Sequence, residues 1–159
     1  MNDTAIQDLY PEDVAWCYGC GRLNLHGHHV RSTWEGEDSV CRFTPEAHHI
    51  AVPGFVYGGL IASLIDCHST GTAAATAARL EGWQPGMPGA PRFVTASLHV
   101  DYLKPTPLGP ELVLRAHVQE IQGRKIVVES TLSVGERICA KGRVVAARMP
   151  EGMIPKSAS

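Results

Sequence analysis

The chain has 159 residues, of which 44% are apolar and 19% are charged, and its formal net charge is −2 at pH 7. This length is enough for one hydrophobic core, so we expect a single domain over residues 1–159. The nearly balanced charge argues against a broad surface for nucleic acid or an anionic membrane, and the sequence shows neither the long apolar run of a membrane span nor the basic, then apolar start of a secretory signal.

The N-terminal segment, residues 1–16, is polar and has no clear hydrophobic period, which indicates a loose arm or a short helix. The chain has five cysteines. This odd, scattered set favours free thiols in the cytoplasm over a disulfide framework.

The C-x-x-C motif of Cys17 and Cys20 has two interpretations. Three histidines follow it closely, which is compatible with a zinc site: His26, His28 and His29. The alternative is a glycine-rich turn with two small buried thiols. No second C-x-x-C follows at zinc-ribbon spacing, the histidines lack zinc-finger spacing, and no strand precedes the motif as in a thioredoxin-like site. We therefore expect no metal here.

A β-hairpin is predicted next. Residues 28–35 alternate between polar and apolar side chains, a turn follows, and residues 39–44 form the second strand. A short connection that contains His48 and His49 then leads to residues 53–80, the most distinctive stretch of the chain.

Residues 53–80 predict one long, buried helix. The stretch opens with a turn and the pair Gly58-Gly59, which allow a sharp bend, and the amides of a helix start favour a nearby anion. Most of the following side chains are small or aliphatic, and a helix that is apolar nearly all round is a buried helix. Asp66 lies about two turns into it. A buried carboxylate is costly unless it has partners or a task.

Long strands follow the helix. Residues 81–92 form a loop with three prolines and three glycines, and loops of this length are usually functional or mobile. Four alternating stretches after it predict strands separated by turns: 93–104, 111–121, 125–134 and 137–148. In the first of them, alternation places one set of side chains on one face: Val94, Ala96, Leu98, Val100 and Tyr102. The opposite face then carries Thr95, Ser97, His99 and Asp101. The tail, residues 150–159, is polar and expected to be frayed.

The order of elements predicts an α+β domain. Strands segregated from a single helix indicate a curved antiparallel sheet of about six strands that wraps the long helix. Because such a sheet leaves a long unpaired edge, we expect a homodimer.

Three segments, in this order, resemble the hotdog-fold acyl-CoA thioesterases of the phenylacetate-pathway and thioesterase-superfamily-member types. The run from Tyr57 to Asp66 is similar to their H-G-G-x-x-x-x-x-x-D/E motif. Residues 17–27 and 95–105 are similar to their C-x-x-C-G-x-x-N-x-x-G and T-A-x-L-x-V-x-Y-x-K-P segments, and the resemblance covers residues 17–148. Tyr57 stands where the family often has histidine. A tyrosine there can donate a hydrogen bond to a thioester carbonyl or simply pack.

The resemblance implies hydrolysis of an acyl-CoA thioester to the free acid and coenzyme A. Asp66 would act as general base on water or as nucleophile on the thioester carbonyl, and a carboxylate that only binds backbone amides or an interface partner is the alternative. Gly58 and Gly59 would offer backbone N–H groups to the oxyanion. The resemblance implies a homodimer or a dimer of dimers and no metal or redox cofactor, since coenzyme A is part of the substrate.

Three further residues match polar positions of the family. Thr70 lies one turn after Asp66, where a threonine can hold the attacking water or bond back to its own helix. Thr95 matches a threonine that some relatives place opposite the aspartate from the partner subunit, and an ordinary strand threonine is the alternative. His49 matches a position that contacts the substrate carbonyl, with a solvent-facing loop histidine as the alternative.

Coenzyme A carries phosphates, and its thioester carries an acyl group. Trp83 and Met87, in the proline-rich loop, are available as apolar contacts for the acyl chain. Cationic candidates for the phosphates, each otherwise a solvated surface charge, are Arg92, Lys104, Arg124 and Lys125.

Two other functions compete with hydrolysis. A non-hydrolytic acyl-CoA or acyl-carrier binding protein on the same fold is favoured by Tyr57 in place of the histidine. A hotdog hydratase needs an aspartate–histidine pair in a hydratase-type motif, which this helix does not show.

Overall fold

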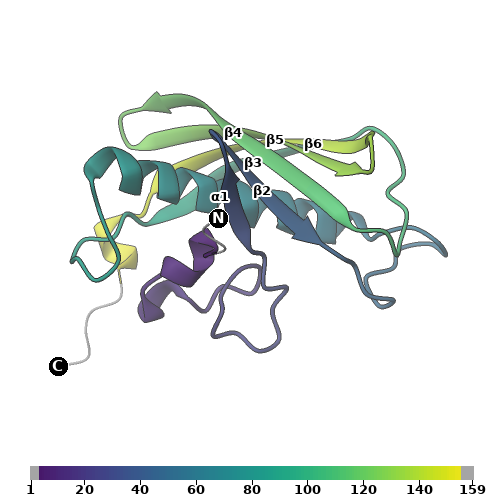
Figure 1. The fold of residues 1–159 in the computed structure, drawn as a ribbon, viewed down its shortest axis with the longest axis horizontal. Helices are drawn as coiled ribbons and strands as arrows, with labels where there is room; N and C mark the ends of the chain where they lie inside the picture. Colours follow the sequence, from purple (N-terminus) through teal and green to yellow (C-terminus); the bar gives the residue numbers. More distant parts are fainter. Residues whose placement is uncertain (1–3, 155–159) are drawn as a thin grey trace.

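The computed structural model describes residues 4–154, which form one long helix, six strands and three short 3₁₀-helices (Figure 1). In chain order the elements are η1 (Ile6–Leu9), η2 (Glu12–Val14), β1 (Ser32–Glu35), β2 (Asp38–Phe43), α1 (Gly58–Glu81), β3 (Phe93–Tyr102), β4 (Leu112–Gln122), β5 (Lys125–Val134), β6 (Arg137–Arg148) and η3 (Glu151–Met153). Among the described residues no helix combines the length and the apolar character that a membrane crossing requires.

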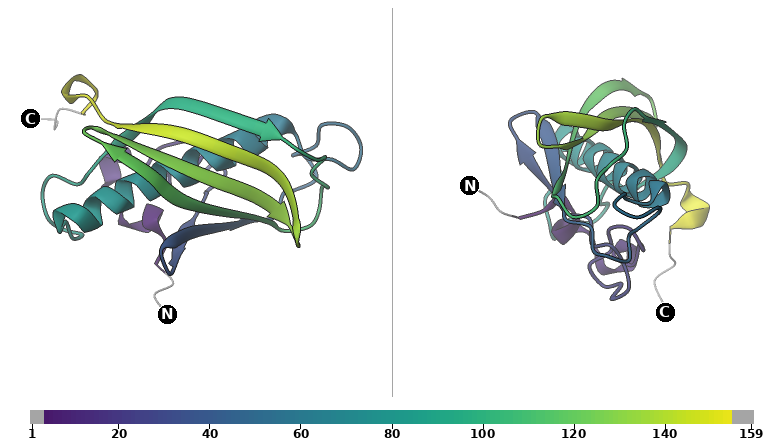
Figure 2. Two further views of the ribbon diagram at one scale, coloured as in Figure 1. Left: turned by 90° about the horizontal axis from the view of Figure 1, so that it is seen from above. Right: turned by 90° about the vertical axis from the view of Figure 1, so that its right-hand side faces the viewer.

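The strands form a single antiparallel sheet in the order β1-β2-β4-β5-β6-β3. The sheet curves over α1, and the N-terminal arm lies on the other side of the helix (Figures 1 and 2). The predicted α+β architecture, in which a six-stranded antiparallel sheet wraps one long helix, is therefore confirmed; this is the hotdog fold. The outer strands of the sheet are β1 and β3.

Helix α1 is long because nothing interrupts it before a glycine stop signal. Gly82 adopts a left-handed conformation with φ 66°, and the N–H of Trp83 bonds the carbonyl of Ala78 at 2.9 Å, which ends the helix. The sheet packs closely against the helix, because a Cβ on Gly142 of β6 would lie 2.3 Å from Cγ2 of Ile65. Most of the helix is covered, as its small residues predict, and its buried residues are Leu60, Ile61, Leu64, Ile65, His68, Ser69, Gly71, Thr72, Ala73, Ala74 and Ala77.

The N-terminal arm packs against the domain, so the loose arm considered for residues 1–16 is wrong for the part that the structure describes. Ala5, Ile6 and Gln7 are buried. The side chain of Gln7 accepts a hydrogen bond from the backbone N–H of Ser32 at 2.8 Å and donates one to its hydroxyl at 3.2 Å. The arm forms two 3₁₀-helices, which are too short to show a helical period in the sequence.

The first strand is shorter than the predicted span 28–35. His29 has a positive φ of 53°, and the N–H groups of His28 and Val30 bond the carbonyls of Tyr18 and Gly19, both at 2.9 Å. These bonds tie residues 28–30 to the cysteine-containing loop, so β1 begins only at Ser32. At the other end, η3 occupies part of the predicted frayed tail, and residues 155–159 lie outside the described residues.

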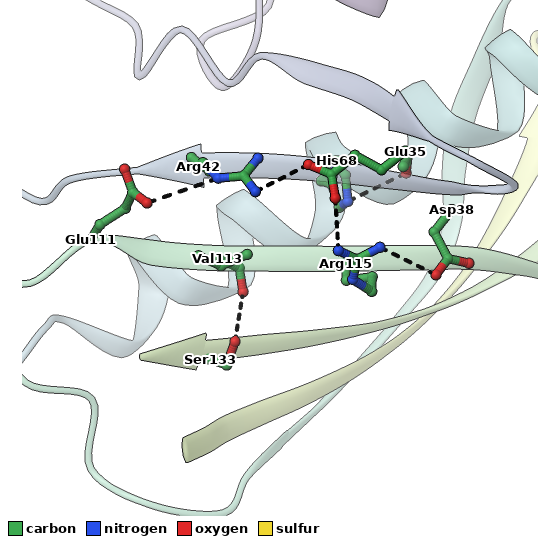
Figure 3. Close-up of polar contacts among 9 residues, drawn as sticks. Glu35, Asp38, Arg42, His68, Glu111, Val113, Arg115 and Ser133 are labelled. Carbon is green, nitrogen blue, oxygen red and sulfur yellow. Dashed lines mark hydrogen bonds and ion pairs between the residues drawn. The ribbon is translucent and has the colours of Figure 1, made fainter. Parts of the chain in front are cut away.

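Ion pairs join the β1–β2 hairpin to β4 on the outer face of the sheet (Figure 3). Arg115 reaches Glu35 at 2.8 Å and Asp38 at 3.4 Å, and Arg42 reaches Glu35 at 3.0 Å. All four side chains are partly exposed, so these pairs contribute little to stability.

His68 connects α1 to the hairpin through buried hydrogen bonds. Its Nδ1 lies 2.8 Å from the Ser32 hydroxyl and its Nε2 lies 3.4 Å from the Ser39 hydroxyl, and the Ser39 hydroxyl also lies 2.5 Å from that of Thr72. Burial lowers the pKa of His68 to about 4, so the ring is neutral in the folded protein at pH 7.

This neutral histidine predicts a loss of stability in acid. Because the pKa of His68 is lower in the folded chain than in the unfolded chain, the unfolded state binds a proton first as the pH falls from about 6.5 to 4. We expect the free energy of unfolding to drop in this window by up to ~1.4 kcal/mol per pH unit. Urea unfolding of wild type and His68→Gln measures this, and equal pH slopes for the two proteins would contradict it.

Candidate active site

Asp66, Thr70 and Thr95 lie together beside a cavity. The Thr95 hydroxyl donates to Oδ1 of Asp66 at 2.5 Å, and the hydroxyls of Thr70 and Thr95 lie 3.2 Å apart. Asp66 and Thr70 are one turn apart on α1, whereas Thr95 comes from β3. Three of the predicted catalytic residues therefore form one hydrogen-bonded group.

The Thr95 that bonds Asp66 belongs to the same chain, which corrects the arrangement that the family resemblance implied. The reason is a β-bulge in β3, where the register to β6 shifts between Thr95 and Ser97. A bulge reverses which face the following side chains occupy. Thr95 therefore faces α1 together with Tyr102, whose hydroxyl donates to the Gly58 carbonyl at 2.7 Å. The regular alternation predicted for residues 93–104 is wrong at this point.

The environment of Asp66 makes its carboxylate more basic. Burial raises the pKa of Asp66, the hydrogen bond from Thr95 opposes that rise, and the nearby Cys17 sulfur adds to it. The side chain is partly buried rather than enclosed, so it remains open to a ligand in the cavity. A partly buried carboxylate of raised basicity is suited to accept a proton.

The cavity beside Asp66 has a volume of about 810 Å³ and mostly apolar walls. Its walls come from the N-terminal arm, the cysteine-containing loop, β1, α1, the loop after α1, the start of β3 and the segment after β6. They include Trp34, Trp83 and Phe93. Arg92 also lines it, but its guanidinium is paired with Asp13 at 2.8 Å. The cavity is large enough for a small-molecule ligand with an apolar part.

A second cavity, of about 620 Å³, lies at the start of α1. It is lined by His49, Tyr57 and Gly59, three of the predicted site residues. His49 is not a free loop histidine, because its Nδ1 accepts from the N–H of Glu46 at 2.9 Å. The Tyr57 ring lies over Gly59, because a Cβ on Gly59 would lie 2.4 Å from it, and the Tyr57 side chain is itself exposed.

The structure does not bring the glycine pair and Asp66 to one point within a single chain. Asp66 is seven residues after Gly59, which is about 10 Å along the helix axis, and the two residues line different cavities. Lys104, predicted to bind phosphate, is exposed after the end of β3 and lines neither cavity.

Sequence reasoning missed Cys67 and the arm residues that wall the first cavity. The sulfurs of Cys17, Cys20 and Cys67 lie within 4.8 Å of one another. Hydrogen bonds from the Cys20 and Cys67 thiols lower the pKa of Cys17. Cys67 directly follows Asp66 in the sequence, but no spacing rule joins it to the C-x-x-C motif. The arm residues gave no signal because the arm shows no hydrophobic period.

Comparisons of this chain with a family model and with known proteins point to the same family. The sequence model of the thioesterase superfamily matches residues 53–141. Acyl-coenzyme A thioesterase THEM4 of Rattus norvegicus is 38% identical over 93 residues, which span 58% of this chain but only 34% of that protein. The chain thus spans about a third of the length of this curated relative.

Solved structures show the same fold. A thioesterase superfamily protein from Shewanella loihica is 48% identical, with a TM-score of 0.65 over 80% of this chain and 96% of that one. A Streptococcus mutans protein bound to acetyl-CoA is 20% identical, with a TM-score of 0.62 over 76% of this chain and 88% of that one. At that identity the second likeness concerns the fold alone.

The bond from Thr95 predicts how the Asp66 carboxyl titrates. Since this bond stabilises the carboxylate, Thr95→Val should raise the pKa of Asp66 further above its usual range. Carbon-13 NMR titration of the aspartate carboxyls, in buffer with a chelator, measures the shift. Ser97→Ala, beyond the bulge, is the matched control and should leave that pKa unchanged. An unshifted or lowered pKa in Thr95→Val would contradict the assignment.

Proposed function

The chain belongs to the thioesterase superfamily, and from this premise we propose that it hydrolyses the thioester of an acyl-coenzyme A to the free acid and coenzyme A. The observation that carries the proposal is the Asp66–Thr95–Thr70 group beside a large, mostly apolar cavity. The name of the THEM4 relative, an acyl-coenzyme A thioesterase, supports the same substrate class.

In the proposed reaction the Asp66 carboxylate drives attack on the thioester carbon, as base on a water or as nucleophile. Its raised basicity favours proton transfer from water, and the Thr70 hydroxyl, 3.2 Å from that of Thr95, would hold that water. The tetrahedral intermediate carries negative charge on the former carbonyl oxygen. Backbone N–H groups of Gly58 and Gly59, at the start of α1, are suited to that charge. The intermediate collapses by breaking the carbon–sulfur bond, and on the base route the proton that Asp66 took from water goes to the departing thiolate. On the nucleophilic route water then hydrolyses the acyl–Asp66 anhydride, which gives the free acid and restores the carboxylate.

The acyl group would occupy the first cavity. Its walls include Trp83, as the sequence suggested, together with Trp34 and Phe93. An apolar wall around one polar group suits an acyl chain whose reactive carbonyl must meet a carboxylate. Of the cations proposed for the phosphates, Arg92 is engaged by Asp13, whereas Lys104 is exposed and free to turn toward a ligand at the sheet edge.

The complete site would form in a homodimer. Gly59 and Asp66 of one chain line different cavities, so in the proposed site the oxyanion donors come from a second copy. Strand β3 is an outer strand of the sheet with exposed residues 95–99, and an unpaired strand edge of this kind can pair with a second copy.

One observation favours a second candidate, a non-hydrolytic acyl-CoA or acyl-carrier binding protein. Tyr57 replaces the histidine of the family motif, and its ring lies over Gly59, close to the amides that would stabilise the oxyanion. If the ring blocks these amides, the cavity binds a thioester without cleaving it.

Asp66→Asn tests the proposed hydrolysis. The substitution keeps the shape of the side chain and removes the base, so turnover should fall by at least ~10²-fold with the melting temperature retained. The measurement is thiol release from a panel of acyl-CoAs. Asp101→Asn is the matched control, because Asp101 is exposed on β3 with a hydrogen bond to His99, and its activity should equal that of wild type. Nearly full activity in Asp66→Asn would refute the role of Asp66, and binding without thiol release by wild type would favour the second candidate.

Mixed dimers test the shared site. His49 lines the cavity of Gly59 and would contact the thioester carbonyl in the second copy. Once His49→Ala is shown to be inactive alone, we expect Asp66→Asn and His49→Ala to regain about a quarter of wild-type activity after mixing and refolding, because half of the dimers then carry one intact site of two. Asp66→Asn mixed with Thr95→Ala is the control pair. Asp66 and Thr95 of one chain belong to the same site. Each site of a mixed dimer then carries one of the two substitutions, so no activity should return. Recovery in the control pair, or none in the first pair once mixed dimers are demonstrated, would contradict this arrangement.

A further inference from the structure

Three cysteine side chains meet between the N-terminal segment and α1. Cys17 and Cys20 come from the loop before β1, and Cys67 comes from the helix. Their sulfurs all lie within 4.8 Å of one another, and those of Cys17 and Cys67 are 3.8 Å apart. All three are free thiols. The proposed hydrolysis uses none of them.

Backbone hydrogen bonds and a close approach to α1 fix the loop that carries Cys17 and Cys20. The N–H of Gly21 bonds the Cys17 carbonyl at 2.7 Å, and the N–H of Val30 bonds the Gly19 carbonyl at 2.9 Å. Gly19 lies directly over the helix, because a Cβ there would lie 2.2 Å from the Cys67 sulfur. The loop therefore holds its two sulfurs against the third, and the thiolate is the form of cysteine that binds a metal.

We propose that Cys17, Cys20 and Cys67 bind a thiophilic divalent cation of the zinc class through their three sulfurs. Zinc–sulfur bonds of about 2.3 Å in a tetrahedron place two sulfurs about 3.8 Å apart, which is the separation of Cys17 and Cys67. Three protein ligands leave a fourth position for water or another ligand. A disulfide would use only two of the three sulfurs and would leave the third without a role.

The place of this cluster differs from what the sequence suggested. The spacing of cysteines and histidines in the sequence indicates no third ligand for the C-x-x-C motif, and on that basis we expected no metal. The third sulfur comes from the central helix. All three cysteines line the cavity that Asp66 also lines, so the open position of a bound ion faces this cavity. The proposal does not rest on thioester hydrolysis, because it concerns binding by the sulfurs only.

Cadmium titration of the reduced full-length chain tests the proposal. We expect binding at one equivalent with sulfur-to-metal charge-transfer absorption, displacement of bound zinc by cadmium, and X-ray absorption that shows three sulfurs at about 2.3 Å from bound zinc. Cys67→Ser and Cys17→Ser should each weaken binding by at least ~10–100-fold, the loss seen when even outer-shell partners are removed. The exposed position of Cys17 makes the second variant the safer one for folding.

Cys139→Ala is the matched control, because this buried thiol on β6 lies outside the cluster and its removal should leave the affinity unchanged. Circular dichroism and melting temperature verify that each variant is folded. Absence of binding by the reduced protein at micromolar cadmium or zinc would overturn the proposal. So would a Cys67→Ser variant that binds as tightly as wild type, since the ion would then be held by the C-x-x-C motif and the neighbouring histidines.

Discussion

Close contact between α1 and the concave face of the sheet is the constraint on which the rest of this structure depends. Gly142 of β6 lets the backbone approach Ile65, and the small residues of the helix allow similar contact along most of its length. On the opposite side, a Cβ on Gly71 would lie 2.8 Å from the amide of Gln7, so the N-terminal arm is equally close. A helix enclosed from both sides leaves little water for any polar group that it carries.

This enclosure shifts the pKa values of two side chains in the middle of α1. Burial lowers the pKa of His68 and raises the pKa of Asp66, because in both cases it disfavours the charged form. His68 is fully buried and is satisfied by hydroxyls of the hairpin. Asp66 borders a cavity and has the Thr95 hydroxyl as a partner. The same physical cause therefore yields a structural residue at one position and a candidate catalytic residue two positions away.

The arrangement of the cavities follows from the length of the helix. A single helix carries Gly59 at its start and Asp66 two turns later, so one chain places these two residues in separate cavities. A proposed site that needs both groups requires a second copy. The N-terminal segment covers the helix and also lines the cavity of Asp66. Its loop brings the C-x-x-C sulfurs close to that of Cys67.

Much of the architecture was predictable from the sequence. The long helix, the four long strands after it and the Asp66 position follow from local patterns, because hydrophobic period, glycine and proline act over a few residues. The hotdog fold and the family follow from three motifs in order. The proximity of Asp66 and Thr70 also follows, since both lie one turn apart on one helix.

Other features depend on contacts between distant segments, so no local sequence pattern predicts them. The bulge beyond Thr95 turns that side chain toward Asp66 of its own chain, and its cause is the pairing of β3 with β6. His29 ends the first strand early because its neighbours bond the cysteine-containing loop. The third sulfur of the cysteine cluster belongs to α1. Sequence alone determined the elements and the candidate base, whereas only the packing of strands, arm and loop against the helix decided which groups meet there.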